Sequence, residues 1–186
     1  MFSSSAAVIP SLTDREARQA SEATSTVRKK TKPLLFMDID GVLSLFGFES
    51  DTRPDGVWMN VDGILHLISA AAPEHLQRLV GSYELVWCSG WEEKANEHLL
   101  GTLALAGPLP YLTFPPVDGA RHWKLASIEE HALDRPLAWV DDGHDDGCHA
   151  WAAERGAPTL LVATDPAVGL TGAQVGELES WARGLA

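Results

Sequence analysis

Four short apolar runs recur along this chain of 186 residues, and they restrict its possible folds more than any other feature. Each run is nearly continuous in apolar character, as strands buried on both faces of a sheet are. The runs cover residues 34–37, 84–88, 137–140 and 159–162. Helical spacing of apolar residues occupies the segments between them, roughly residues 73–80, 91–100, 123–133 and 145–155. This alternation predicts an α/β domain with a doubly wound parallel sheet.

A capping box predicts the start of a last helix near the C-terminus. Thr171 is followed three residues later by Gln174, the spacing at which the two side chains can satisfy each other's backbone N–H groups. Val175, Leu178 and Trp181 then recur at helical intervals and give this helix an apolar face.

The first 33 residues differ from the rest in composition and charge. Residues 1–33 hold six Lys/Arg and three Asp/Glu, whereas the rest holds eight and 23, so that a net charge of -12 combines a basic arm with a strongly acidic remainder. We predict a flexible N-terminal arm over 1–33 and one folded domain over 34–186. An acidic domain repels a phosphate backbone, which disfavours extended nucleic-acid binding but leaves capture of a single phosphate end open.

The bulk composition indicates a globular protein of the cytoplasm. Apolar residues make up 45% and charged residues 22% of the chain, which suits a soluble domain with a core. Two cysteines, Cys88 and Cys148, cannot build the disulfide framework of a small secreted protein. The sequence has no signal-peptide pattern and no apolar stretch of membrane-spanning length, so we expect no membrane association.

Polar residues follow three of the apolar runs at the point where each predicted strand ends. They are Asp38-Ile39-Asp40-Gly41, Ser89-Gly90 and Asp141-Asp142-Gly143. In an open parallel sheet these strand ends lie at one edge, where ligands bind. Converging carboxylates repel one another unless a cation neutralises them, and hard oxygen ligands suit Mg²⁺, which also accepts substrate phosphate. The sequence therefore predicts a magnesium and phosphate site, although one Asp-x-Asp-Gly alone is also typical of a turn.

The spacing of Asp38 and Asp40 suits a division of labour between two carboxylates. A turn at the strand end can direct one carboxylate at phosphorus and place the other beside it, and Gly41 lets the backbone leave the strand. The first carboxylate can then attack phosphorus, while the second donates a proton to the leaving oxygen and later takes one from water.

At these residues the sequence resembles the haloacid dehalogenase (HAD) superfamily, whose phosphatases carry four short motifs in order on a Rossmann-like, doubly wound fold. The resemblance covers about residues 34–162. The first motif matches at residues 35–42 and is specific, and the second matches at 85–89. The third motif is a lysine near a helix start, for which Lys124 is the candidate, and the fourth matches at 139–142.

The resemblance implies a role for each matching residue. Asp38 would form an aspartyl-phosphate, and Asp40 would be the acid/base. Ser89 would hydrogen-bond the transferring phosphoryl group, and Lys124 would neutralise charge there and on Asp38. Asp141 would complete the Mg²⁺ site.

The remaining metal ligands and the identity of the lysine are less constrained. The resemblance implies that the Asp38 carboxylate and the Asp40 backbone carbonyl also bind the metal, and we expect Asp142 to support Asp141 through hydrogen bonding or water. Lys94 and Arg121 are alternatives to Lys124, which is preferred because its helix has an apolar face and shortly precedes the Asp141 strand.

More narrowly, residues 87–92, 95–96 and 107–110 resemble the HAD domain of bacterial Swiss-army-knife RNA repair proteins, which suggests phosphate ends on nucleic acid as substrates. Trp58 and Trp91, with Ser89 and Gly90, are the candidate substrate-binding residues, because Trp58 lies in the insert after Asp40 and Trp91 follows Ser89-Gly90. Trp87, Trp139 and Trp181 are expected in the core and His66 in a structural role. The insert, about residues 42–83, is long enough only for a small cap.

Three functions follow from these residues. The first is a Mg²⁺-dependent phosphohydrolase acting on a small phosphomonoester or a nucleic-acid end. The second is a phosphotransferase with the same covalent intermediate, which differs only in its acceptor. The third is a noncatalytic domain that binds phosphate or nucleic acid, although it would have little reason to combine Asp38, Asp40, Ser89, Lys124 and Asp141. The sequence leaves the oligomeric state open.

Overall fold

The computed structural model describes residues 31–116 and 121–185. The predicted arm falls almost entirely on residues 1–30, outside the described residues. Lys32 and Pro33, which the sequence placed at the end of the arm, are joined to the folded unit by hydrogen bonds. The Lys32 ammonium donates to the Val80 carbonyl over 2.9 Å, and the Glu84 N–H donates to the Pro33 carbonyl over 3.0 Å.

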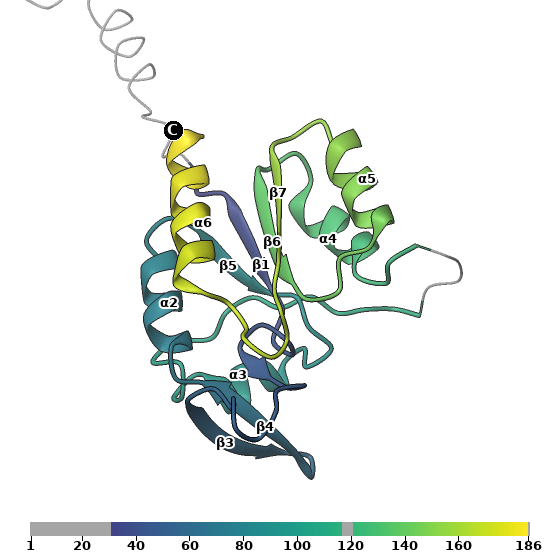
Figure 1. Cartoon of the computed structure of the whole chain (residues 1–186). Coiled ribbons are helices and arrows are strands. Elements are labelled where there is room, and N and C mark those ends of the chain that lie inside the picture. The colour runs from purple at the N-terminus through teal and green to yellow at the C-terminus, as the bar shows by residue number, and fades with distance from the viewer. Residues whose placement is uncertain (1–30, 117–120, 186) are drawn as a thin grey trace, which may run out of the picture. The chain divides into compact units, whose positions relative to one another are not determined.

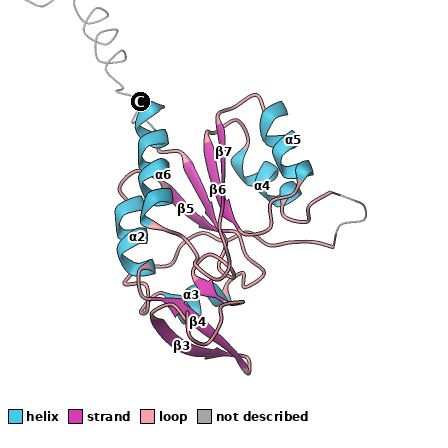
Figure 2. Cartoon of the chain, viewed as in Figure 1, coloured by secondary structure: helices cyan, strands magenta, loops and turns pink. Residues whose placement is uncertain are grey.

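A parallel sheet of four strands forms the centre of the domain (Figures 1 and 2). Its order is β5-β1-β6-β7. The strands are β1 (Leu34–Met37), β5 (Glu84–Trp87), β6 (Leu137–Asp141) and β7 (Thr159–Ala163). All four coincide with the predicted apolar runs to within one residue at either end. β1 and β6 are buried along their whole length, which explains why their sequences are continuously apolar.

Helices cover both faces of this sheet, as expected of a doubly wound fold (Figure 1). On one face, α2 (Ala72–Leu79) and α6 (Gly172–Gly184) pack with Leu35 and Met37 of β1. On the other, α4 (Leu125–Ala132) and α5 (Asp146–Glu154) pack with Leu34 and Phe36. Successive residues of β1 thus enter two separate cores, because side chains alternate across a strand. Trp87 and Trp139 are fully buried, as predicted.

The insert after β1 forms a second, antiparallel sheet that the sequence interpretation did not include. Its order is β2-β4-β3, with β2 (Ser44–Leu45), β3 (Gly56–Val61) and β4 (Ile64–Ser69). Asp62 and Gly63 connect β3 to β4 with φ values of 53° and 87°. An Asp-Gly pair is the turn that tight hairpins favour, since both positions need positive φ. The small cap is therefore a three-stranded antiparallel sheet, of which β3 and β4 form a tight hairpin.

The segment after β5 leaves the sheet through α3 (Lys94–Leu99), which is shorter than the predicted helix over 91–100. The chain then returns to β5 for one parallel bridge between Tyr111 and Trp87. The Trp87 N–H donates to Pro110 over 2.8 Å, and the Leu112 N–H donates to Trp87 over 2.9 Å. This segment acts as a rudimentary fifth strand at the sheet edge.

In the described part of the chain, no helix combines the length and apolarity that crossing a bilayer requires.

The predicted capping box is present at the start of α6. The Thr171 hydroxyl accepts from the Gln174 N–H over 3.4 Å, and the Gln174 side chain accepts from the Thr171 N–H over 2.8 Å. Because α6 buries Val175 and Leu178 in the core, fixing its first turn supports one whole face of the sheet.

We expect Thr171→Ala to lower the free energy of unfolding by about 1 kcal/mol. The substitution disrupts the capping box that satisfies the backbone N–H groups of Thr171 and Gln174. Thr52→Ala is the matched control, since the Thr52 hydroxyl makes only an exposed bond to the Glu49 carbonyl over 3.4 Å. Urea denaturation measures both. Equal effects in the two variants would show that the capping box contributes nothing beyond an ordinary surface bond.

Candidate active site

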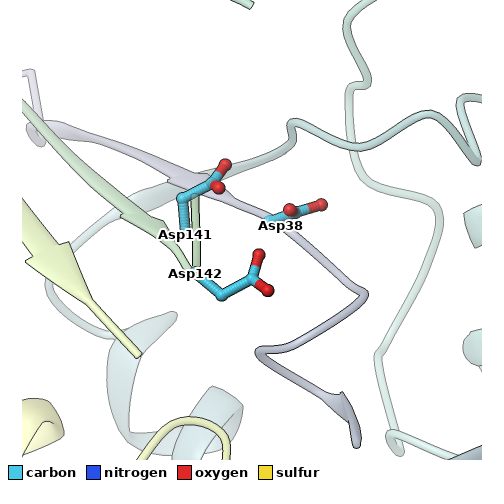
Figure 3. A group of neighbouring side chains, drawn as sticks. All are labelled: Asp38, Asp141 and Asp142. Carbon is cyan, nitrogen blue, oxygen red and sulfur yellow. The ribbon is translucent and has the colours of Figure 1, made fainter. Parts of the chain in front are cut away.

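Three carboxylates meet at the carboxyl end of the parallel sheet. Asp38 follows β1, whereas Asp141 ends β6 and Asp142 follows it. The hydrogen bond from the Asp38 N–H to the Val140 carbonyl, 3.0 Å long, extends the pairing of the two strands to the site. One carboxylate oxygen from each residue lies within 4.8 Å of the others, and Figure 3 shows the three side chains around a shared space. The predicted convergence of Asp38, Asp141 and Asp142 is thus present.

Lys124 bridges two of these carboxylates. It occupies the N-cap position of α4, and its ammonium lies 2.6 Å from Asp38 Oδ2 and 2.6 Å from Asp141 Oδ2. All three residues are buried, with exposures of 2% for Lys124, 6% for Asp38 and 2% for Asp141. Burial alone would lower the pKa of Lys124, but the two carboxylates outweigh it and raise that pKa, so Lys124 stays charged.

Neither alternative cation reaches the carboxylates. Arg121 pairs with Glu129 over 2.6 Å, and Lys94 pairs with Asp62 at the tip of the β3–β4 hairpin. The preference for Lys124 therefore agrees with its position in the structure.

Opposing effects of burial and neighbouring charges determine the pKa of Asp38. Desolvation by burial raises its pKa from 3.8 to about 6; the Lys124 ammonium opposes this shift, and the Asp141 carboxylate adds to it. The pKa of Asp142 is also raised, first by desolvation and then by Asp141. Three carboxylates with one ammonium leave an excess of negative charge, so this donor set suits a divalent cation with a preference for oxygen ligands.

Asp141 and Asp142 differ in how many of their oxygens are already used. Asp141 Oδ2 accepts from Lys124 and, over 3.0 Å, from the Trp139 indole, while Oδ1 accepts from the Gly143 N–H over 2.9 Å. The Asp142 side chain is less buried and points into the shared space (Figure 3). Asp141 is therefore placed to orient Lys124. The carboxylate of Asp142 has fewer hydrogen-bond partners than that of Asp141.

The absence of a side chain at Gly41 leaves space for the Asp142 carboxylate. Gly41 has a φ of 75°, and a Cβ there would lie 2.3 Å from Asp142 Oδ2. Its carbonyl accepts from the buried Thr164 hydroxyl over 2.9 Å, which ties this turn to the end of β7. Only glycine meets both demands, the backbone conformation and the close approach of a carboxylate.

Asp40 is held by two side chains from other parts of the chain. The Trp91 indole donates to Asp40 Oδ2 over 2.9 Å, and His66 Nδ1 lies 3.3 Å from Asp40 Oδ1. His66 also contacts the Ser44 hydroxyl over 3.0 Å, and its ring meets that of Trp91 edge to face at 4.6 Å. Both contacts fix the orientation of Asp40. Nothing in the spacing of His66 indicates this role, because the contact depends on the fold of the hairpin.

The structure separates the predicted substrate-binding residues. Ser89 is buried two residues after the end of β5, while Gly90 and Trp91 line a cavity together with Asp40. Trp58 lies apart from them on β3. It pairs with Leu67, and because neighbouring residues of a strand face opposite ways, it lies on the other face of the hairpin from His66. The structure does not bring the Trp58 side chain to Asp40.

We expect Gly41→Ala to destabilise the domain by roughly 1–3 kcal/mol more than Gly47→Ala. Gly47 has a φ of 77° and no atom within 4 Å of an added Cβ, so this control carries the backbone strain, about 1 kcal/mol, without the collision. Urea denaturation of both variants gives the comparison. Equal destabilisation would mean that Asp142 moves aside freely and that its position near Gly41 is not fixed.

The sequence was compared with known proteins. A family model described as "HAD domain in Swiss Army Knife RNA repair proteins" matches residues 34–175. No curated protein matches the sequence. The matched range contains the whole parallel sheet, the hairpin and all the carboxylates described above. Together with the parallel sheet flanked by helices, this match shows that the chain belongs to the family of HAD domains found in Swiss Army Knife RNA repair proteins.

Proposed function

We propose that this protein is a Mg²⁺-dependent phosphohydrolase that uses Asp38 as its nucleophile. The observation that carries the proposal is the Asp38 carboxylate, which lies at the end of β1 within 2.6 Å of Lys124 and within 4.8 Å of the other two carboxylates. Membership of the HAD family supports the same chemistry. Phosphoryl transfer requires a positioned nucleophile and neutralised charge, and both features are built from buried groups here.

The orientation of Asp38 supports attack on phosphorus. Its Oδ1 accepts from the Ile39 N–H over 2.7 Å, and Oδ2 lies against Lys124. These contacts hold the carboxylate at the strand end and reduce the number of orientations it samples before attack. Lys124 would also neutralise phosphate charge, and the Ser89 hydroxyl would hydrogen-bond the phosphoryl oxygens.

Asp40 suits the role of acid/base. Its carboxylate is 45% exposed, in contrast to Asp38, and Trp91 and His66 orient it. In this role it would donate a proton to the leaving oxygen and later accept one from the attacking water. The two aspartates of the first motif thus occupy different environments, which is how two carboxylates acquire different tasks.

The carboxylates would hold the Mg²⁺ ion, which when bound neutralises charge on the phosphate and on Asp38. Asp38 and Asp142 are the proposed carboxylate ligands, because each has fewer hydrogen-bond partners than Asp141, with the Asp40 backbone carbonyl as a further ligand. Asp142 is a better candidate than Asp141 for the direct ligand, because Asp141 already accepts three hydrogen bonds.

The substrate proposal is a phosphomonoester, either a small molecule or a phosphorylated nucleic-acid end in the cytoplasm. The RNA repair proteins of the family support the second choice, while the acidic domain disfavours long contacts with a phosphate backbone. A Mg²⁺-dependent screen of sugar phosphates, nucleotides and 3′- or 5′-phosphorylated oligonucleotides tests the activity. Absence of phosphate release from every class would contradict it.

We expect Asp38→Asn to fold and to lose turnover by at least about a thousandfold, because an amide is a poor nucleophile. Asp134→Asn is the control, since Asp134 is exposed in the loop after α4. Initial rates with saturating Mg²⁺ and circular dichroism of both variants decide the point. Turnover near the wild-type rate in Asp38→Asn would remove Asp38 from this role.

The elevated pKa of Asp38 predicts a pH-dependent stability in the absence of metal. The pKa of Asp38 is about 6 in the folded protein, whereas an unperturbed aspartate, as in the unfolded chain, has a value of 3.8. The folded state therefore binds the proton more tightly than the unfolded state. The stabilisation from this group is complete below about pH 4 and is lost as the pH rises through about 6. Between pH 4 and 7, the wild type should lose on the order of 2–3 kcal/mol relative to Asp38→Asn. Urea titrations in a chelator measure this difference, and parallel pH profiles would contradict it.

Mg²⁺ titration distinguishes the roles of Asp141 and Asp142. We expect Asp142→Asn to weaken Mg²⁺ binding about tenfold or more, because it removes the less occupied carboxylate. Asp141→Asn should chiefly disturb Lys124 and lower turnover, with a smaller loss of affinity. Calorimetry on both variants measures the affinities. A large loss in Asp141→Asn together with an unchanged affinity in Asp142→Asn would reverse the two assignments.

A further inference from the structure

A small cavity lies between the β3–β4 hairpin and the segment after β5. Its volume is about 190 Å³, and Asp40 and Gly90 are among its lining residues. Sites for drug-sized ligands span roughly 300–1,000 Å³, so this cavity holds a single ring rather than an extended molecule.

The position of Asp40 relates this cavity to the reaction. If Asp40 protonates the leaving oxygen, the group attached to that oxygen must lie beside the Asp40 carboxylate. Gly90, which follows the phosphate-binding candidate Ser89, lines the same space. The cavity is therefore placed to receive the leaving group, an inference that depends on the proposed phosphohydrolase activity.

The charged groups of the cavity indicate what kind of leaving group it accepts. Asp40, Asp62 and Lys94 line it together with His66, so two carboxylates face one ammonium and one imidazole. A second phosphate on the leaving group would meet this excess of negative charge. A neutral leaving group avoids the repulsion.

The ion pair of Asp62 and Lys94 offers a donor and an acceptor side by side. The two side chains are 62% and 52% exposed, so each retains hydrogen-bonding capacity beyond the pair. An ammonium has three donors and a carboxylate has several lone pairs, whereas each hydroxyl both donates and accepts. Neighbouring hydroxyls on a ring match this arrangement.

Apolar side chains complete the wall. Val61 and Ile64 flank the hairpin turn, and the Trp91 ring lines the cavity from the segment after β5. Val61 is 6% and Trp91 9% exposed, so both are fixed by packing, while Ile64 is 62% exposed. The carbon face of a sugar ring packs against such surfaces while its hydroxyls reach polar groups.

We propose that this cavity is the leaving-group subsite and that it selects a neutral ring bearing adjacent hydroxyls, with Lys94 and Asp62 as the residues that recognise them. A free sugar phosphate and the ribose of a nucleotide both present this chemistry. Asp38 attacks phosphorus as the bond to the ester oxygen breaks, Asp40 gives that oxygen a proton, and the hydroxylated ring leaves from the cavity. Water then hydrolyses the aspartyl-phosphate and releases phosphate.

The test compares rings with and without hydroxyls. Wild-type kcat/KM is measured with Mg²⁺ for cyclohexyl phosphate, inositol monophosphate, a pentose 5-phosphate and a nucleoside 5′-monophosphate. We expect each hydroxylated ring to exceed cyclohexyl phosphate by about tenfold or more, since a polar site discriminates against a ligand without matching groups. Preference for the nucleotide over the pentose phosphate would identify a nucleoside as the leaving group, and the reverse a free sugar. Equal values for cyclohexyl and inositol phosphates would overturn the proposal.

Two variants assign the preference to the ion pair. Lys94→Met and Asp62→Asn should each lower kcat/KM for the hydroxylated rings about tenfold, chiefly through KM, and lower it several-fold less for cyclohexyl phosphate. Arg78→Met is the matched control, because it breaks another exposed ion pair, with Glu179, away from the cavity. Equal loss on all substrates would overturn the recognition role.

Binding to the Asp38→Asn variant separates this proposal from the proposed activity. Calorimetry with Mg²⁺ measures its affinity for inositol and cyclohexyl phosphates without turnover. Preference for inositol phosphate, abolished by adding Lys94→Met, would support the subsite even if the wild type hydrolysed neither compound, which would contradict only the activity. Absent or equal binding of the two compounds would overturn the subsite.

Discussion

Repulsion among buried carboxylates at the carboxyl end of the parallel sheet is the constraint on which the rest of this structure depends. Asp38, Asp141 and Asp142 lie within 4.8 Å of one another, and two of them are almost completely buried. Lys124 compensates part of this charge through two contacts of 2.6 Å. We expect this excess of negative charge to lower the stability of the folded domain when no cation is bound, as is common at functional sites.

The surrounding fold fixes this arrangement from several directions. The central strands β1 and β6 bring the carboxylates together, α4 delivers Lys124 from one face, and the turn at Gly41 makes room for Asp142. The hairpin adds His66 beside Asp40. The site therefore depends on contacts between segments far apart in the chain, so a substitution in the hairpin can alter Asp40 without touching Asp38.

The parallel sheet and the carboxylate cluster were predictable from sequence because buried strands require continuous apolar runs, and the polar residues follow those runs directly. The β3–β4 hairpin was not predicted, although its Asp62-Gly63 turn was a usable signal. The contacts of Trp91 and His66 with Asp40 had no sequence signal, because they arise only when the hairpin and the segment after β5 meet. Trp58 shows the converse: its place in the insert suggested a site residue, but strand alternation puts it on the other face.

The central claim is that the Asp38 carboxylate forms a covalent bond to phosphorus. Acid quenching of the protein during turnover, followed by mass spectrometry of its peptides, tests it directly. The account predicts the added mass of one phosphoryl group on the peptide that contains Asp38, dependent on Mg²⁺ and absent from Asp38→Asn. A phosphoryl group on another residue such as Ser89, or turnover that continues in Asp38→Asn, would contradict it.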